Sequence, residues 1–487
     1  MAKSLKVNYL LNLINTVAGM VFPLITFPYA SRILQAEGIG IVNFYQSIIS
    51  YISLVSCLGI PLYATREIAK VRENPSELSK RANEILFLHI LLTALAYVVV
   101  VILCLTVPEI KKDTPLFLVL SSLLLFNAMG CDWFFKGTED FKYITIRGLI
   151  CRIIYIPLLF IFVKTRDDLL IYGLLTVGVQ VGNNVFNIYR LTRLVRLRDM
   201  KEASRYPKRH LKGAVKIFLL SASTSLYLQV NVIILGFMAN TTDVGYYTAA
   251  NRIISIASGV IIALQSTLLP RMSALMASDD KEATRNTLNK VLSFLFCMGF
   301  PMVMGMNVMA PLIIKLFAGD SFFPSIPTLQ ILSFNMIVAC FNGFISTGIL
   351  VPQGKEKEAT IACFIGGLIN IGANFALIPF FVQNGTAAAA ILTELSVAFG
   401  MIILGRNYIP IKLWNMGFFK YIASSIVMWI GCNLLWDYVP HEAFRLTVIP
   451  ISGVILYFIS LWCLRDNFSR EILTGLINRL IKKRQPI

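Results

Sequence analysis

The sequence predicts an all-α polytopic membrane protein with about 14 transmembrane helices. Of its 487 residues, 56% are hydrophobic and only 14% are charged, and the mean hydropathy is +0.71. A soluble chain carries roughly 25% charged residues. Apolar windows of about 20 residues, the length that crosses a bilayer as a helix, recur along the chain. The loops between the windows alternate in charge, which is typical of a multi-pass protein.

Fourteen apolar windows account for the predicted helices in order. They cover residues 8–30, 40–64, 85–107, 115–135, 143–163, 169–189, 216–239, 246–269, 291–318, 327–351, 361–381, 386–405, 421–439 and 446–464. Each is long enough to cross about 30 Å of hydrocarbon as a helix. The linkers on the charge-poor side, such as residues 319–325 and 382–385, are short. We therefore expect no extramembrane domain.

The most basic stretch, residues 190–216, sets the predicted orientation. It contains ten Lys or Arg against two acids, and positively charged loops beside membrane spans stay in the cytoplasm. Lys3 and Lys6 before the first window and the basic tail at 482–484 belong to the same side. Both termini are therefore predicted to be cytoplasmic, which requires an even number of spans. The same pattern explains the net charge of +18 without nucleic acid as a partner.

The basic stretch also divides the chain into two predicted six-helix lobes. We expect an N-terminal lobe at 1–189, a basic cytoplasmic connector at 190–215, a C-terminal lobe at 216–405, and a helix pair with a basic tail at 406–487. A pseudo-two-fold repeat is suggested because the stretch from Gly40 to Arg66 aligns without a gap on the stretch from Gly245 to Arg271. Parallel repeats of this kind are a known transporter architecture. Chance similarity between apolar helices is the alternative.

Cysteine and motif content argue against enzyme and metal chemistry. The nine cysteines are odd in number and include no CxxC pair, which is neither a disulfide framework nor a metal site. The chain contains no P-loop, no HExxH and no GxSxG, and only three His. We therefore expect no metal, no cofactor and no use of ATP within this chain. The N-terminal run lacks a small-residue cleavage site and is expected to be an uncleaved first span.

Polar residues recur at helical spacing on at least six of the windows. These stripes are Asn8, Asn12 and Asn15; Asn43, Ser47 and Ser50; Gln180, Asn184 and Asn187; Ser221, Ser225 and Gln229; Asn251, Ser255 and Ser258; and Asn370 with Asn374. A polar stripe on an otherwise apolar helix turns away from lipid. Interhelical hydrogen bonds, at about 0.6 kcal/mol each, are one explanation. The number of helices involved favours a hydrated central cavity.

Charged residues inside the windows define the candidate site. A charge at the bilayer centre costs at least about 2.5–3.5 kcal/mol, so a functional role is the default expectation. The candidate substrate-binding residues of the cavity are Arg32, Asn43, Gln46, Arg147, Arg152, Asn251 and Arg252. The candidate ion-coupling residues are Asp132, Glu394 and His89. For Arg32, Arg147 and Lys315, near the window ends, snorkelling to the interface is the alternative.

Two motifs are more specific than the hydropathy pattern. The first runs N-x-x-x-G-x-x-x-P-L-I-T-F-P-Y-x-S-R-I-L from Asn15 to Leu34 and continues as G-I-G-x-x-x-F from Gly38 to Phe44. The second is D-W-F-F-K-G-x-E from Asp132 to Glu139, followed by F-x-Y-I at 141–144. Together with the predicted spans, these motifs resemble the Wzx-type polysaccharide repeat-unit flippases of the MOP exporter superfamily over essentially the whole chain.

The resemblance implies a transporter of the bacterial inner membrane rather than an enzyme. Its implied activity is to flip undecaprenyl-diphosphate-linked oligosaccharide from the cytoplasmic to the outer leaflet by alternating access. The expected partners are this substrate, membrane lipid and other polysaccharide assembly proteins. Arginine pairs well with phosphate oxygens, while amides and hydroxyls suit sugars. Drug exporters share the fold, so cation-coupled multidrug export is the alternative, and a membrane glycosyltransferase or polymerase is a third hypothesis.

Overall fold

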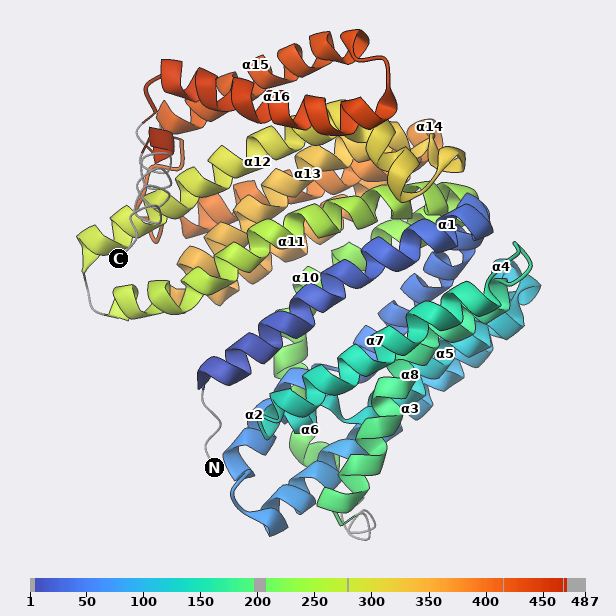
Figure 1. Cartoon of the computed structure of the whole chain (residues 1–487). Helices are drawn as coiled ribbons and strands as arrows, with labels where there is room; N and C mark the ends of the chain where they lie inside the picture. The colour runs from blue at the N-terminus through green and yellow to red at the C-terminus, as the bar shows by residue number, and fades with distance from the viewer. Residues whose placement is uncertain (1–4, 197–206, 278–279, 415, 467, 471–487) are drawn as a thin grey trace, which may run out of the picture. The chain divides into compact units, whose positions relative to one another are not determined.

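A computed structural model describes residues 5–196, 207–277, 280–414, 416–466 and 468–470. Within these ranges the chain is helical and contains no strand (Figure 1), which confirms the predicted all-α class. Part of the predicted connector and nearly all of the predicted basic tail lie outside the described residues. So do the side chains of five residues from the predicted polar stripes, namely Asn8, Asn12, Ser221, Ser225 and Gln229.

Two compact units divide the chain. Unit 1 comprises Met1–Thr248 with Phe317–Ser321, and unit 2 comprises Ala249–Leu316 with Phe322–Ile487. Helix α10 (Pro207–Met238), which the sequence assigns to the second lobe, packs in unit 1 against α1 (Leu5–Cys57), α2 (Ile60–Val71) and α3 (Pro75–Thr106). The two units are defined by contacts in the structure, whereas the predicted lobes follow a repeat in the sequence. The predicted lobe boundaries therefore stay a prediction.

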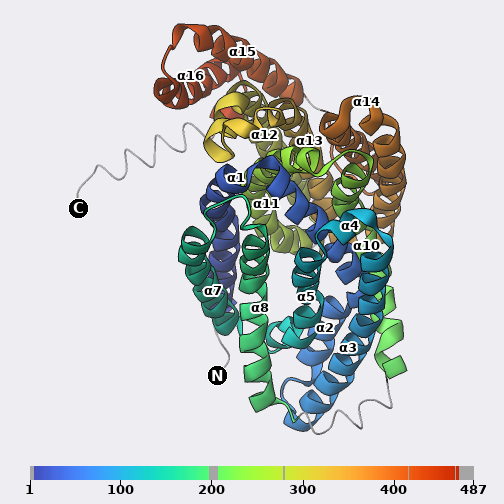
Figure 2. The same ribbon diagram turned by 90° about the vertical axis from the view of Figure 1, so that its right-hand side faces the viewer.

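The remaining helices of unit 1 form a bundle around the N-terminal helix. They are α4 (Pro108–Lys112), α5 (Thr114–Gly130), α6 (Asp132–Gly137), α7 (Phe141–Phe162) and α8 (Leu169–Leu194). Helices α5 and α8 lie side by side, and α7 packs against both α1 and α8 (Figure 2). Polar residues of α1, α5, α7 and α8 can therefore meet inside this unit.

Unit 2 contains the longer helices of the second half. They are most of α11 (Thr241–Ala277), α12 (Lys281–Phe317), α13 (Ser325–Ile345), α14 (Glu356–Gly405), α15 (Met416–Tyr438) and α16 (Glu442–Cys463). A π-helical turn at Ser346–Leu350 and a 3-10 turn at Val351–Gln353 follow α13. Helix α13 packs on α14, and α15 packs on α16. The last two helices are the predicted C-terminal pair.

Ten helices of the described residues are long and apolar enough to cross a membrane. Two of them are much longer than one span, at 44 and 50 residues. Each is broken once, at Gln35 (φ 58°) in α1 and at Val382 (φ 49°) in α14. Both breaks fall between two predicted windows. A multi-pass membrane protein is therefore confirmed, while the number of fourteen spans stays a prediction.

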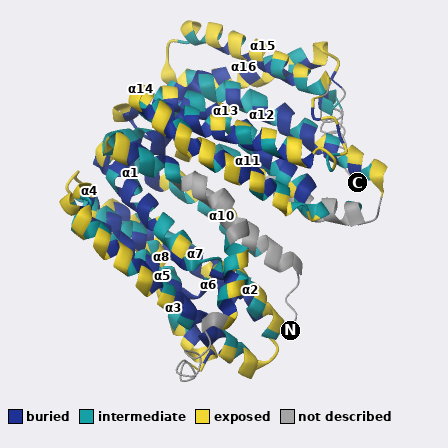
Figure 3. Cartoon of the chain, turned by 180° about the vertical axis from the view of Figure 1, so that it is seen from behind, coloured by how far each residue is buried: buried dark blue, intermediate teal, exposed yellow. Residues whose placement is uncertain are grey.

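The apolar helices carry large exposed hydrophobic side chains on their outer sides. Exposed positions run along α15 and α16 in Figure 3, and examples elsewhere are Leu105, Ile153 and Phe380. In water such a surface would be unfavourable, but in a bilayer it contacts lipid tails at no cost. The pattern agrees with the predicted membrane location.

The chain leaves the second and fourth predicted windows earlier than expected. The helix breaks at Leu58 and Gly59, which both have positive φ, and again at Cys131 (φ 46°). The two short helices that follow, α2 and α6, pack on each other and share a buried apolar core with α3. The windows missed these breaks because the residues beyond them remain apolar on one face.

A buried polar cluster fastens the start of α10 to this core. Glu84 and His210 are each at most 1% exposed, and Glu84 Oε2 lies 2.7 Å from His210 Nε2. The other ring nitrogen of His210 lies 2.9 Å from the hydroxyl of Tyr63. The cluster joins residues from α3, α10 and α2, so the helix that follows the basic connector is anchored in unit 1.

The turn between α7 and α8 is organised by Asp168. Its carboxylate accepts hydrogen bonds from the backbone N–H groups of Lys164 (2.9 Å) and Thr165 (2.8 Å). These bonds favour the charged form and lower the pKa of Asp168 below its ordinary value. The turn is thereby set immediately before α8 begins at Leu169.

Two glycines bring α1 and α11 into backbone contact. A Cβ on Gly40 would overlap the carbonyl oxygen of Thr241, and a Cβ on Gly245 would overlap that of Ala36. The two contacts are related by one shift along the chain, since 245 minus 40 and 241 minus 36 both give 205. Reciprocal contacts of this kind are what a two-fold axis produces. They support the predicted repeat, which remains a proposal.

We expect Gly40→Ala and Gly245→Ala to destabilise the protein by about 1–3 kcal/mol, because the added methyl group must push two backbones apart. The measurement is the apparent unfolding midpoint of the purified protein in detergent. Gly178→Ala is the matched control, because a Cβ there meets nothing within 4 Å, and alanine normally favours a helix over glycine. Equal midpoints for Gly40→Ala and Gly178→Ala would contradict the close crossing.

Candidate functional site

A polar cavity of about 390 Å³ lies inside unit 1. Its walls come from α1, α2, α3, α5, α6, α7 and α8. Among the described residues its charged lining consists of Asp132, Lys136, Arg147 and Arg152, which is three cations against one acid. The amide side chains of Asn15, Asn127, Gln180, Asn183 and Asn184 line it as well. The cavity therefore offers a positive potential and many hydrogen-bonding groups.

The short helix α6 brings an acid and a lysine to this cavity. Its three aromatic residues, Trp133, Phe134 and Phe135, are at most 3% exposed and belong to the apolar core shared with α2 and α3. Asp132 and Lys136 are four residues apart, so they share one face of the helix, and both line the cavity. Lys136 Nζ lies 3.1 Å from Asp132 Oδ2. Burial of the aromatic residues thus fixes where this ion pair points.

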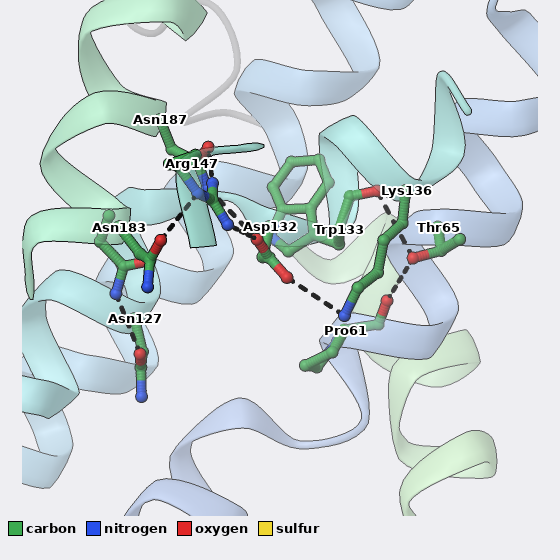
Figure 4. A network of polar contacts seen from close by, with 10 residues as sticks. Pro61, Thr65, Asn127, Asp132, Trp133, Lys136, Arg147, Asn183 and Asn187 are labelled. Carbon is green, nitrogen blue, oxygen red and sulfur yellow. Dashed lines mark hydrogen bonds and ion pairs between the residues drawn. The ribbon is translucent and has the colours of Figure 1, made fainter. Parts of the chain in front are cut away.

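Arg147 on α7 is the most enclosed of the cavity cations, with a side chain 8% exposed. Its Nη2 donates to Asp132 Oδ1 at 2.9 Å, and its Nε donates to Asn183 Oδ1 at 3.1 Å. Nη1 donates to the side-chain oxygen of Asn187. Figure 4 shows these side chains pointing toward one another from α6, α7 and α8. A buried guanidinium is stable here because protein groups replace its water.

Arg152, also on α7, is held more loosely. Within the described part of the chain its guanidinium donates to Asn15 alone, to Oδ1 at 3.0 Å and to the backbone oxygen at 3.3 Å. Gly148 lies close to this contact, since a Cβ there would lie only 3.3 Å from Asn15 Oδ1. A Cβ on Gly19 would lie 3.6 Å from Arg152 Nη2, which is an ordinary contact distance. Arg152 therefore keeps donors that can face the cavity.

The amides of α5 and α8 form a second polar wall. Asn184 Nδ2 donates to Asn127 Oδ1 at 3.1 Å, and Gly130 leaves space for this side chain, since a Cβ there would overlap Asn184 Oδ1. Gln180, one turn before Asn184 on α8, is exposed. Amides both donate and accept hydrogen bonds, as sugar hydroxyls require. This wall is suited to a neutral, hydroxyl-rich ligand.

The structure brings four of the predicted site residues together in this cavity. Arg147, Arg152, Asp132 and His89 all line it. His89 is 2% exposed, and its Nε2 lies 3.4 Å from Cys57 Sγ. His89 is therefore more enclosed at the cavity wall than Arg147, Arg152 or Asp132.

The other predicted residues lie elsewhere. Arg32 is exposed and donates to the Pro28 carbonyl at 2.7 Å. Asn43 donates back to its own helix at Ile39 (2.8 Å), and Gln46 is half-buried. None of these three lines the unit 1 cavity. Asn251 and Arg252 belong to unit 2, where both are exposed on α11.

Glu394, the last of the predicted residues, lies in a buried polar group of unit 2. It is 6% exposed, and Asn342 Nδ2 donates to its Oε2 at 2.7 Å and to its backbone oxygen at 2.8 Å. The neighbouring residue Thr393 accepts from Asn370 at 2.8 Å. Its role in ion coupling stays a prediction.

Sequence reasoning missed three cavity residues, Lys136, Asn127 and Asn183. Lys136 directly follows the window at 115–135, and hydropathy does not reveal the break at Cys131. The i, i+4 spacing of Asp132 and Lys136 was the available signal, because it places opposite charges on one face of a helix. Asn183 lies beside the stripe of Gln180, Asn184 and Asn187 and not on it, and Asn127 belongs to a window without a polar stripe.

An all-helical, multi-pass bundle with a polar cavity among its spans defines a membrane transporter. The chain belongs to the polysaccharide biosynthesis protein family, whose model matches residues 5–276. It is 25% identical over 390 residues to a putative O-antigen transporter of Escherichia coli K12, covering 80% of this chain and 94% of that protein. The family resemblance and the prediction of a transporter rather than an enzyme are confirmed.

Solved structures show the same fold. The lipid II flippase MurJ in an inward closed conformation superposes with a TM-score of 0.67 at 15% identity, over 97% of this chain and 99% of that one. An inward-facing multidrug resistance MATE transporter of the MOP superfamily gives 0.62 at 15% identity, over 81% and 94%. At this identity the likeness establishes the MOP-type fold and no substrate.

We expect Arg147→Ala to destabilise the protein by about 1–3 kcal/mol, because the side-chain oxygen of Asn187, which is fully buried, loses the guanidinium that donates to it. Arg152→Ala should cost less, since Arg152 has fewer protein partners. Unfolding of both purified variants in detergent is the measurement. If Arg152→Ala is as unstable as Arg147→Ala, then Arg147 is not held more firmly by the protein than Arg152.

Proposed function

We propose that the protein flips an undecaprenyl-diphosphate-linked oligosaccharide repeat unit from the cytoplasmic to the outer leaflet of the bacterial inner membrane. The flipping would proceed by alternating access and would serve surface polysaccharide biosynthesis. One observation carries the proposal: the unit 1 cavity combines three cations and one acid with five amide side chains. The cations suit a diphosphate, and the amides suit sugar hydroxyls.

The names of the relatives point the same way. One relative is named a putative O-antigen transporter, and one structural neighbour is named a lipid II flippase. The predicted cytoplasmic termini set the orientation of the chain in the membrane, and the proposed direction of flipping follows from the family resemblance. Other polysaccharide assembly proteins remain expected partners.

The physics of the step explains why a cavity is needed. A bare charge cannot enter hydrocarbon, and even one unpaired amide costs about 2–7 kcal/mol. A cavity of amides and guanidinium groups replaces the water that a diphosphate and its sugars lose. Two negative charges moving outward gain roughly 4.6 kcal/mol at an inside-negative potential of about 100 mV. The membrane potential is therefore an energy source that needs no ATP site in the chain.

Multidrug export by a chain with this fold is the second candidate. An exporter of cationic drugs needs acidic and aromatic groups in its cavity. The unit 1 cavity contains aromatic residues, Trp133 and Phe141, but its charge balance is the opposite, with three cations against Asp132. The charge of the cavity thus favours an anionic substrate.

Depletion of the protein from a polysaccharide-producing cell should leave the lipid-linked repeat unit on the cytoplasmic leaflet. We expect Arg152→Gln to reduce export at least tenfold at normal protein level, because the cavity loses its most available guanidinium. Two quantities are measured: the amount of surface polysaccharide, and the leaflet in which labelling finds the lipid-linked unit.

Lys142→Gln is the matched control, since Lys142 is exposed at the start of α7 and does not line the cavity. Normal export after depletion would contradict the flippase proposal. Altered drug resistance with unchanged polysaccharide would support the multidrug alternative instead.

A further inference from the structure

We propose that Asp132 is a resident counter-anion of the cavity, which an incoming diphosphate displaces from Lys136 while Arg147 keeps Asp132 in place. The proposal rests on the proposed function and names how the same site receives its anionic group. It assigns Lys136 and Arg152 to direct contact with the diphosphate. It makes Arg147 a positioning residue that acts through Asp132.

Arg147 and Arg152 differ in how many of their hydrogen-bond donors are used by the protein. Arg147 uses donors from all three of its nitrogen atoms on protein acceptors, namely Asp132, Asn183 and Asn187. It is 8% exposed, so a ligand would have to break a buried network to reach it. Removing a buried ion from its partners is costly. Arg147 is therefore the fixed end of the site.

Asp132 divides its two carboxylate oxygens between two cations. Oδ1 accepts from Arg147 at 2.9 Å, with Asn187 Nδ2 at 3.4 Å, and Oδ2 faces Lys136 Nζ at 3.1 Å. The Lys136 side chain is 51% exposed and that of Asp132 is 41% exposed. Ion pairs exposed to this degree contribute little. A ligand can therefore break the contact between Asp132 and Lys136 more easily than the contact between Asp132 and Arg147.

The charge balance then matches a dianion. Without ligand, Asp132 neutralises one of the three cations, which leaves a cavity charge of about two positive units. A flexible ammonium group can turn from Asp132 to a phosphate oxygen at small cost. Arg152, whose described protein partner is Asn15, contributes further donors. The diphosphate would therefore lie between Lys136 and Arg152.

A resident anion also has a functional reason. A transporter must release what it binds, so a site with three uncompensated cations would hold a diphosphate too long. Because Asp132 competes for Lys136, it lowers the affinity and returns the lysine to its resting partner when the ligand leaves. This is the balance between entry and exit that permeation sites need.

The test measures binding of inorganic pyrophosphate to the purified full-length protein by calorimetry. We expect Asp132→Asn to bind about fivefold more tightly than the wild type, the limit for an exposed pair. The substitution is isosteric, and its amide oxygen can still accept from Arg147. Lys136→Gln should bind more weakly. In the Lys136→Gln background, Asp132→Asn should give no gain, because the competition needs the lysine.

Glu139→Gln is the control, because it removes an equal charge from an exposed acid seven positions further on, outside the cavity. It should leave pyrophosphate affinity unchanged. Farnesyl diphosphate should show the same ratios as pyrophosphate, because the site recognises the diphosphate group and not the tail.

Three results would overturn the counter-anion proposal. The first is that Asp132→Asn binds pyrophosphate no more tightly than the wild type. The second is that Asp132→Asn raises the affinity just as much in the Lys136→Gln background. The third is that neither the wild type nor Asp132→Asn binds pyrophosphate. The export experiment decides the flippase proposal separately. A chain that exports normally with Asp132→Asn and shows no change in affinity would keep the flippase function and lose the resident anion.

Discussion

A guanidinium group cannot remain inside a membrane bundle without partners, and the interior of unit 1 depends on this constraint. Arg147 obtains its partners from α6 and α8 while standing on α7. The same network sets Asp132, which in turn holds Lys136. Burial of Trp133, Phe134 and Phe135 in the apolar core shared with α2 and α3 holds α6 in place, which keeps the acid aimed at the arginine. One buried charge thereby ties three helices together and gives the cavity its polar lining.

The cavity that results has two chemically different walls. One carries Lys136 and Arg152, which are suited to a charged phosphate group, and the other carries the amides of α5 and α8, which are suited to sugars. A lipid-linked oligosaccharide has the same division between a diphosphate and a neutral glycan. The MOP-type fold alone serves several substrates, so it is this lining that favours the flippase over the drug exporter.

Much of the fold could be predicted from the sequence because lipid constrains helices strongly. Hydropathy and loop charge predicted the helical class, and the breaks at Gln35 and Val382 fall between predicted windows. The short helices α2 and α6 could not be predicted, because backbone turns at Leu58 and Cys131 leave no mark in hydropathy. For the site, intramembrane charge pointed to Arg147, Arg152 and Asp132. It missed Lys136, whose place depends on the turn at Cys131. It also pointed to Arg252, which is exposed in unit 2 and whose role stays a prediction.

The central claim is that this chain moves a diphosphate-linked glycan between leaflets without a nucleotide. Its most direct test uses sealed proteoliposomes that contain the purified protein and an undecaprenyl-diphosphate-linked repeat unit in both leaflets. A glycosidase added outside reports which molecules reach the outer surface. The account predicts that the protein makes the inner-leaflet molecules accessible, faster when the potential drives negative charge outward. Digestion that stops at the outer-leaflet share, as in vesicles without protein, would contradict it.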